Sequence, residues 1–285
     1  MIDHDGAPGA LLRAAGVTVI RSGSVILDDV SLTVERGQRW ALMGANGAGK
    51  STLISLLAAI EHPSRGVVEV LGHRLGRVDV RDLRPHVGLV ASRFAPARDL
   101  DALEVTLTGA TGSADLVPRW RPADALLSRA RTLLAAFGVD PARAQRWSTM
   151  SQGERARTLI ARALLTDPAV LLLDEAATGL DVAGREQLIE ALDDAQAARP
   201  QLGMVTVTHH FEELPRSTTH ALLLRDGRTV AAGPVQDVLD SAQVSECFAH
   251  PLVVTRVDGR WHARTDASVT RPRAPATAGP PARDR

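Results

Sequence analysis

The sequence predicts an α/β fold, in which buried strands alternate with helices around a core. A short apolar strand over residues 39–43 leads into a glycine-rich turn, and an apolar helix over residues 53–59 follows the turn. Residues 170–173 form a continuous apolar run, which is typical of a parallel strand with both faces covered. With 285 residues, the chain is long enough to bury a full core, as one large domain or as one domain with a lobe.

The amino-terminal third is predicted to be rich in strands. Residues 17–19 and 30–34 favour strands, and the second of these alternates apolar and polar residues. Residues 66–72 predict another strand, which is bounded by glycines. We expect these strands to form a small antiparallel layer beside the glycine-rich turn. Residues 87–91 predict a further core strand that ends at Ser92.

The middle of the chain changes from irregular to helical. Residues 94–120 show no regular pattern and are rich in Pro, Gly and Asp. Residues 123–137 carry apolar residues at helical spacing, and so do residues 152–165. The second of these helices is predicted to begin after Ser151, because serine is a favoured residue at a helix start.

The last third returns to alternating strands and helices. We expect a helix over residues 184–198 and a strand over residues 204–208. Residues 222–231 predict a hairpin that turns at an Asp-Gly pair. Both ends of the chain are expected to be disordered, residues 1–10 at the start and the Pro-, Ala- and Arg-rich residues 264–285 at the end.

Composition narrows the class of protein. Lys and Arg together number 33 and Asp and Glu together also number 33, so a general polyanion-binding role has no support and no nucleic-acid partner is expected. The single cysteine, Cys247, excludes an internal disulfide framework and suits a reducing compartment. Neither a bilayer-spanning apolar run nor a secretory signal is recognisable in the sequence. We therefore expect a cytosolic protein.

The turn after residues 39–43 matches the phosphate-binding pattern G-x-x-x-x-G-K-[ST] at every constrained position. Its glycines let backbone N–H groups approach phosphate oxygens, and the following helix adds its positive N-terminal end. Lys50 is expected to reach the β- and γ-phosphates, and the Ser51 hydroxyl to bind Mg²⁺. The alternative is a glycine-rich loop that only happens to end in Lys-Ser. The predicted nucleotide-binding residues are Gly44, Ala45, Asn46, Gly47, Ala48, Gly49, Lys50, Ser51 and Thr52.

Two acids follow the apolar run at residues 170–173. A buried strand that delivers acids at its C-terminal end is the usual way to place a carboxylate beside Mg²⁺. Asp174 is predicted to hold the metal, directly or through water, and Glu175 to polarise the attacking water. The alternative is a pair of acids that begins a surface loop.

Three further motifs each have two interpretations. Ser151 and Glu154 form a helix capping box or, with the helix N-terminus, a γ-phosphate site. Gly153 favours the phosphate site, because glycine within a first turn lowers helix stability. His209 follows a strand, where it is either a contact to the γ-phosphate or the attacking water, or a solvated surface residue. Asp181, considered alone, is only a helix N-cap.

The order and spacing of these motifs resemble the ATP-binding cassette (ABC) family, over about residues 11–233. The resemblance implies a domain over residues 11–257 with a RecA-like P-loop NTPase core, an antiparallel β subdomain and an inserted α-helical subdomain at about residues 94–165. It also implies an ATPase that requires ATP and Mg²⁺ and forms a head-to-tail dimer with Asp181 at the seam. By this resemblance, Glu175 and His209 are catalytic, and the signature that closes over the partner's ATP is Ser151, Gln152, Gly153 and Glu154.

Several residues depart from the family's pattern. Ser92 stands where the family usually has a Gln that senses Mg²⁺, and we expect its oxygen to serve the metal directly or through water. Arg21 aligns with the aromatic residue that stacks on adenine, and a guanidinium can also stack on a base. The usual Gly, Gln and Pro are replaced by Gln152, Glu154 and Ala176. Ser92 and the context of Trp40 resemble the branch that includes photorepair- and molybdate-type cassette ATPases.

Three functions are compatible with this resemblance. The leading one is the ATP-hydrolysing subunit of a transporter, with the permease on a separate chain and this subunit in the cytoplasm at the inner face of the cell membrane. The alternatives are a soluble cassette ATPase without a permease and a regulatory ATP binder. The intact Lys50, Glu175 and His209 argue against the regulatory binder.

Overall fold

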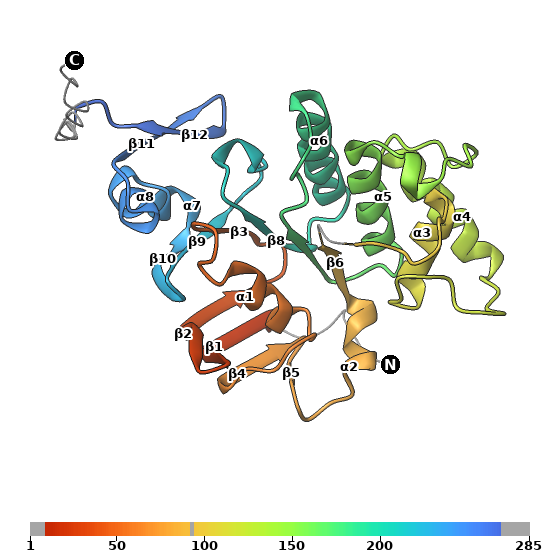
Figure 1. Cartoon of the computed structure of the whole chain (residues 1–285), viewed down its shortest axis with the longest axis horizontal. Coiled ribbons are helices and arrows are strands. Elements are labelled where there is room, and N and C mark those ends of the chain that lie inside the picture. The colour runs from red at the N-terminus through yellow and green to blue at the C-terminus, as the bar shows by residue number, and fades with distance from the viewer. Residues whose placement is uncertain (1–8, 92–93, 269–285) are drawn as a thin grey trace, which may run out of the picture.

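The computed structural model describes residues 9–91 and 94–268. Its centre is a six-stranded sheet in the order β10-β9-β3-β8-β7-β6 (Figure 1). Neighbouring strands are parallel, except that β10 runs antiparallel to β9. The predicted α/β fold with a parallel core sheet is therefore confirmed. The strands are β3 (Arg39–Met43), β6 (Val87–Ala91), β7 (Val170–Asp174), β8 (Gly203–Thr208), β9 (His220–Arg225) and β10 (Arg228–Pro234).

An antiparallel layer in the order β2-β1-β4-β5 packs over helix α1, as Figure 1 shows. Leu32 of this layer, Leu53 of α1 and Leu172 of the core sheet belong to one buried apolar cluster. Helix α1 is thus held between the two sheets, which fixes the phosphate loop at its start. The elements are β1 (Leu12–Arg21), β2 (Ser24–Val34), α1 (Lys50–Leu57), β4 (Arg65–Val70) and β5 (His73–Arg74).

A helical lobe covers the β6 and β7 side of the core sheet (Figure 1). Alternate residues of β7 face opposite sides, because Leu172 packs towards α1 while Leu171 and Leu173 pack in the cluster of the lobe. The apolar run of this strand is therefore buried on both faces, as predicted. The elements on this side are α3 (Ala102–Leu107), η2 (Thr108–Ala110), α4 (Asp124–Ala136), η3 (Trp147–Thr149), α5 (Gln152–Leu164) and α6 (Val182–Ala198). Helix α2 (Val80–Leu83) and η1 (Arg84–His86) precede β6 outside the lobe (Figure 1), and Leu83 belongs to the apolar cluster around α1.

The carboxy-terminal elements cover β3 and β9 and end in a separate two-stranded hairpin. This region comprises η4 (Phe211–Glu213), α7 (Val235–Val238), α8 (Ser241–Phe248), β11 (Leu252–Val257) and β12 (Arg260–Thr265). The predicted disordered tail begins too early, because Arg264 and Thr265 pair with β11. The predicted domain end at residue 257 likewise falls inside the hairpin. Residues 1–8 and 269–285 lie outside the described part of the chain.

Candidate active site

The phosphate loop leaves β3 at Gly44 and enters α1 at Lys50. Gly44 has a φ of +151°, and a Cβ atom there would lie 2.1 Å from Leu224 O. Gly49 has a φ of +101°, and its Cβ would lie 2.6 Å from Leu27 Cδ2. A side chain at either position would push the loop away from β9 or β2, so the close packing of this loop requires both glycines.

The N-terminal end of α1 is open to an anion. Its N-cap residue, Gly49, makes no side-chain cap, and the first turn holds no acidic residue. The first N–H groups of the helix and its positive end are therefore available to a phosphate. A cavity of about 240 Å³ adjoins this end, and it is lined by Ile26, Asn46, Gly47, Gly49, Lys50, Ser51, Thr52 and Glu175.

Lys50 is a buried cation, only 5% exposed. Its Nζ donates hydrogen bonds to Gly44 O at 2.8 Å and to Ala45 O at 2.9 Å. Burial lowers the pKa of Lys50 below its usual value, and the nearby carboxylates of Glu175 and Asp174 oppose this lowering. The direct hydrogen-bond acceptors of Lys50 are neutral carbonyl groups, so an anionic ligand such as a phosphate would further stabilise its buried charge.

Ser51 and Asp174 meet although they come from different elements. Ser51 lies in the first turn of α1, and Asp174 ends β7. Ser51 Oγ donates a hydrogen bond to Asp174 Oδ1 at 3.2 Å. A hydroxyl and a carboxylate are both hard oxygen ligands, the kind that Mg²⁺ prefers. Mg²⁺ typically takes only one or two such ligands from the protein and completes its coordination with water and phosphate oxygens. The pair therefore fits a Mg²⁺ ion that binds with a nucleotide.

Glu175 and His209 face each other at the ends of β7 and β8. Glu175 has a φ of +52°, which is uncommon for a residue other than glycine. His209 Nδ1 lies 3.4 Å from Glu175 Oε1. The contact lacks hydrogen-bond geometry, so among the described residues this buried nitrogen has no hydrogen-bond partner. An unusual backbone angle and an unsatisfied buried nitrogen at one place indicate a functional site.

Ser151 forms a complete capping box with Glu154. Ser151 Oγ accepts a hydrogen bond from Glu154 N at 3.2 Å, and Glu154 Oε2 accepts from Ser151 N at 2.9 Å and from Ser151 Oγ at 2.9 Å. These bonds, above all the one from Ser151 N, lower the pKa of Glu154. The capping interpretation thus holds within one chain. In the described part of the chain, no residue of α5 lines the cavity beside Lys50.

The start of α5 adjoins the segment after β7. Gln152, Glu175 and Thr178 line a second cavity, of about 180 Å³. Asp181 caps α6, because its Oδ1 accepts a hydrogen bond from Gly184 N at 2.7 Å. Val182 follows and is 69% exposed, which leaves an apolar side chain uncovered at this end of α6.

The predicted roles of Arg21 and Ser92 stay predictions, and Ile26 lines the cavity although no motif pointed to it. Arg21 forms an ion pair with Glu61, so its stacking on adenine stays a prediction. Ser92 lies outside the described residues, and its role also stays a prediction. Ile26 lines the cavity beside Lys50 but belongs to no motif, because an apolar residue near the start of a strand carries no local signal.

Comparisons with known proteins identify the family of this chain. The family model described as ABC transporter matches residues 27–178. A relative named uncharacterized ABC transporter ATP-binding protein YlmA, from Bacillus subtilis (strain 168), is 35% identical over 249 residues, which cover 86% of this chain and 93% of the relative.

This chain belongs to the ABC transporter family. It is an ATP-binding and ATP-hydrolysing subunit of an ABC transporter. Among the described residues, no helix is both long and apolar enough to cross a membrane.

Two solved ABC structures share its fold. One is cbiO1 from Clostridium perfringens, described as part of the transporter complex cbiONQ, with 23% identity, a TM-score of 0.70, and coverage of 84% of this chain and 94% of that chain. The other is a dimeric ATP-binding cassette in a post-hydrolysis state with ADP and Pi. It has 24% identity, a TM-score of 0.67, and coverage of 79% of this chain and 98% of that chain.

Proposed function

We propose that two copies of this ABC subunit bind ATP between them, head to tail. The observation that carries this proposal is that the start of α5 does not reach the cavity beside Lys50 within one chain. Lys50, Ser51 and Glu175 line one cavity, and no described residue of α5 lines it. Ser151 and Gly153 at the start of α5 would therefore reach the γ-phosphate of ATP bound to the other copy. The dimeric relative and the exposed Val182 beside Asp181 support such an interface.

Each residue of the proposed site has a distinct role. Lys50 and the N–H groups at the start of α1 bind the phosphates, and Ser51 with Asp174 would hold Mg²⁺. The bound ion supplies positive charge that stabilises the transferring phosphoryl group. Glu175 orients and polarises the attacking water, and His209, which lies 3.4 Å from it, holds this arrangement beside the γ-phosphate.

A mixing experiment tests the shared site. Lys50→Ala inactivates the phosphate loop but leaves the signature intact, whereas Gly153→Asp does the reverse. Each variant alone is inactive, but the mixture contains heterodimers with one intact composite site. An equimolar mixture should therefore recover about a quarter of wild-type turnover if the sites act independently. A mixture no more active than its two components would contradict the head-to-tail dimer.

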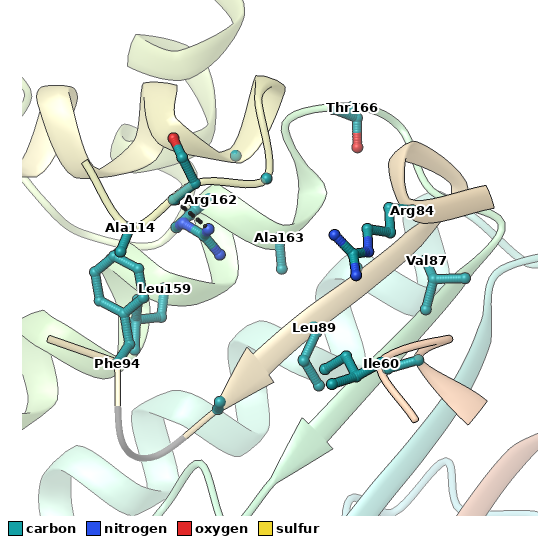
Figure 2. Close-up of a pocket in the computed structure, with 16 residues that line it drawn as sticks. Ile60, Arg84, Val87, Leu89, Phe94, Ala114, Leu159, Arg162, Ala163 and Thr166 are labelled. Atoms are coloured by element: carbon teal, nitrogen blue, oxygen red, sulfur yellow. Dashed lines mark hydrogen bonds between the residues drawn. The ribbon is translucent and has the colours of Figure 1, made fainter. Parts of the chain in front are cut away.

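We further propose that a permease docks in the cavity shown in Figure 2. This cavity, of about 360 Å³, lies between the core sheet and the helical lobe, so an occupant would contact both parts. Ile60 lines it and is 51% exposed, and Arg84 adds a positive charge. The side of the lobe is held by Arg162, whose guanidinium donates to Thr108 Oγ1 at 2.8 Å and to Ser113 O at 2.9 Å. The described residues that line the cavity are Ala58, Ile60, Arg84, Val87, Gly88, Leu89, Ala91, Phe94, Gly109, Gly112, Ser113, Ala114, Leu159, Arg162, Ala163 and Thr166.

Disulfide trapping tests this docking site. The chain has one natural cysteine, Cys247, and it is buried, so an introduced thiol would react alone. Ile60→Cys should cross-link to cysteines in the cytoplasmic loops of a permease encoded beside this gene. Val257→Cys is the matched control, because Val257 is similarly exposed (54%) but lies in the C-terminal hairpin. Cross-linking through Val257 and not Ile60 would place the permease elsewhere.

Ser92 follows strand β6 in the sequence, and this links the two proposals. Strand β6 borders the cavity with Val87, Gly88 and Leu89, and Ser92 follows its last residue. We propose that Ser92 serves the metal in place of the family's Gln, as in the photorepair- and molybdate-type branch. Docking of a permease would then place this subunit at the inner face of the cell membrane.

A further inference from the structure

The C-terminal hairpin contacts α6 and η4, two elements that follow proposed site residues in the sequence. Arg260 opens β12, and its side chain is only 15% exposed. Its guanidinium makes a two-pronged ion pair with Glu186, with NH1 to Oε2 at 2.8 Å and NH2 to Oε1 at 3.2 Å. The same NH2 group also donates to the backbone carbonyl of Glu212. One side chain thus ties α6 to η4.

Both partners of Arg260 lie close in sequence to proposed site residues. Glu186 belongs to α6, the helix that Asp181 caps. Glu212 belongs to η4, which follows His209 at the end of β8. The guanidinium therefore links the segment that follows His209 to the helix that Asp181 caps.

The hairpin is anchored well enough to act as a brace. Trp261, next to Arg260, is 7% exposed and belongs to the same apolar cluster as Phe211 and Leu214, which flank the Glu212 segment. The Arg256 guanidinium lies over the Trp261 ring, 5.4 Å from its centroid. Hydrogen bonds from Arg260 also lower the pKa of Glu186, which keeps its carboxylate charged. A bidentate Arg–carboxylate pair resists rotation better than a single contact.

We propose that Arg260 is a positioning residue for ATP hydrolysis. It holds η4 against α6, and so holds His209 in place beside Glu175. This inference rests on the proposed role of His209. Without Arg260, the segment after His209 would lose its link to α6, and small displacements at a reacting centre reduce turnover strongly. ATP binding at Lys50 would be unaffected, because Lys50 bonds to Gly44 and Ala45 whereas Arg260 bonds to Glu186 and Glu212.

The test is steady-state ATP hydrolysis by the full chain. Arg260→Ala should lower kcat about tenfold and change KM for ATP less than twofold. Arg260→Lys keeps the charge but not the two-pronged contact, so it should recover part of the loss. Glu186→Gln should resemble Arg260→Ala, and the double variant should be no worse than Arg260→Ala, because both changes break one link. Arg264→Ala, an exposed position on the same strand, is the matched control and should keep wild-type turnover.

The outcomes separate this inference from the proposed function. Suppose that His209→Ala lowers turnover while Arg260→Ala and Glu186→Gln stay within twofold of wild type. The positioning role of Arg260 is then wrong, and the proposed active site with His209 is unaffected. If His209→Ala itself hydrolyses ATP at the wild-type rate, the proposed role of His209 is wrong. Glu186 is partly exposed, so Glu186→Gln leaves the protein folded and carries the test even if Arg260→Ala does not fold.

Discussion

His209 Nδ1 lies 3.4 Å from Glu175 Oε1, at the C-terminal ends of two neighbouring parallel strands. The register of β7 and β8 pairs Asp174 with Val207, so the residues just after these strands necessarily come together. The sheet therefore places an acid and an imidazole side by side, next to the cavity that Glu175 shares with Lys50.

Glu175→Gln should separate ATP binding from hydrolysis. The amide keeps the shape of the side chain but cannot polarise water as a carboxylate does, so turnover should fall at least about 100-fold. ATP should still bind, and the ATP-bound variant should elute from a sizing column as a dimer. The same variant without ATP is the control and should elute as a monomer. A monomer in both conditions would count against the shared site.

Glu154→Gln should strengthen the ATP-dependent dimer. The ionised carboxylate of Glu154 lies 2.9 Å from Ser151 Oγ, the hydroxyl proposed to meet the partner's γ-phosphate. Removal of this negative charge should tighten dimerisation about fivefold, equivalent to about 1 kcal/mol at a protein surface. Sedimentation with ATP in the Glu175→Gln background measures the change.

Glu104→Gln is the matched control for that change. Asp101 and Glu104 form the same capping box at the start of α3, so both substitutions alter a helix cap. Only Glu154 belongs to the signature, and Glu104→Gln should leave dimerisation unchanged. If Glu154→Gln weakens dimerisation instead, the carboxylate acts mainly by capping α5 and not by repelling the γ-phosphate of the partner's ATP.

The buried thiol of Cys247 should lower the free energy of unfolding as the pH becomes alkaline. Burial raises the pKa of this thiol from 9.0 to about 11. As the pH rises, the thiol ionises at a lower pH in the unfolded state than in the folded state. The contribution of the buried thiol to the free energy of unfolding is therefore complete below pH 9.0 and is lost as the pH rises through about 11. Between about pH 7 and about pH 10, wild type should lose about 1.4 kcal/mol more unfolding free energy than Cys247→Ala. Urea unfolding at both pH values measures this, and equal losses would contradict the raised pKa.

The local motifs explain why much of the site was predictable. The phosphate loop and the β7 strand with its two acids are contiguous, so their residue types alone predict their structure. Ser151 shows the limit of such local signals. One pattern, Ser-x-x-Glu, fits both a helix cap and a phosphate contact, and a single chain displays only the cap.

The remainder depends on contacts between distant residues. Ile26 joins the cavity because β2 passes the phosphate loop, and Arg260 meets Glu186 only after the whole chain has folded. The C-terminal hairpin did carry a local signal, because Asp258-Gly259 is the same kind of turn as Asp226-Gly227. The predicted boundary at residue 257 divided that hairpin.

Lys50→Ala should weaken ATP binding by at least about 2 kcal/mol, because it removes a charged donor from the phosphates. Calorimetric titration of ATP gives the affinity directly. Arg225→Ala is a suitable control, because it removes a cation from β9 that bonds to Glu246 O and not to the phosphate loop. Equal ATP affinity in wild type and Lys50→Ala would remove Lys50 from the site.

Chemical labelling tests whether Lys50 holds the phosphates, because Lys50 is the only lysine in the sequence. An amine-directed acylating reagent then has two targets, Lys50 and the terminal amino group, and peptide mass spectrometry distinguishes them. If Lys50 holds the phosphates, saturating ATP should slow its acylation at least about tenfold, as expected for an amine engaged in charged hydrogen bonds. The terminal amino group should react equally fast with and without ATP. Acylation of Lys50 at the same rate with and without ATP would mean that Lys50 does not hold the phosphates.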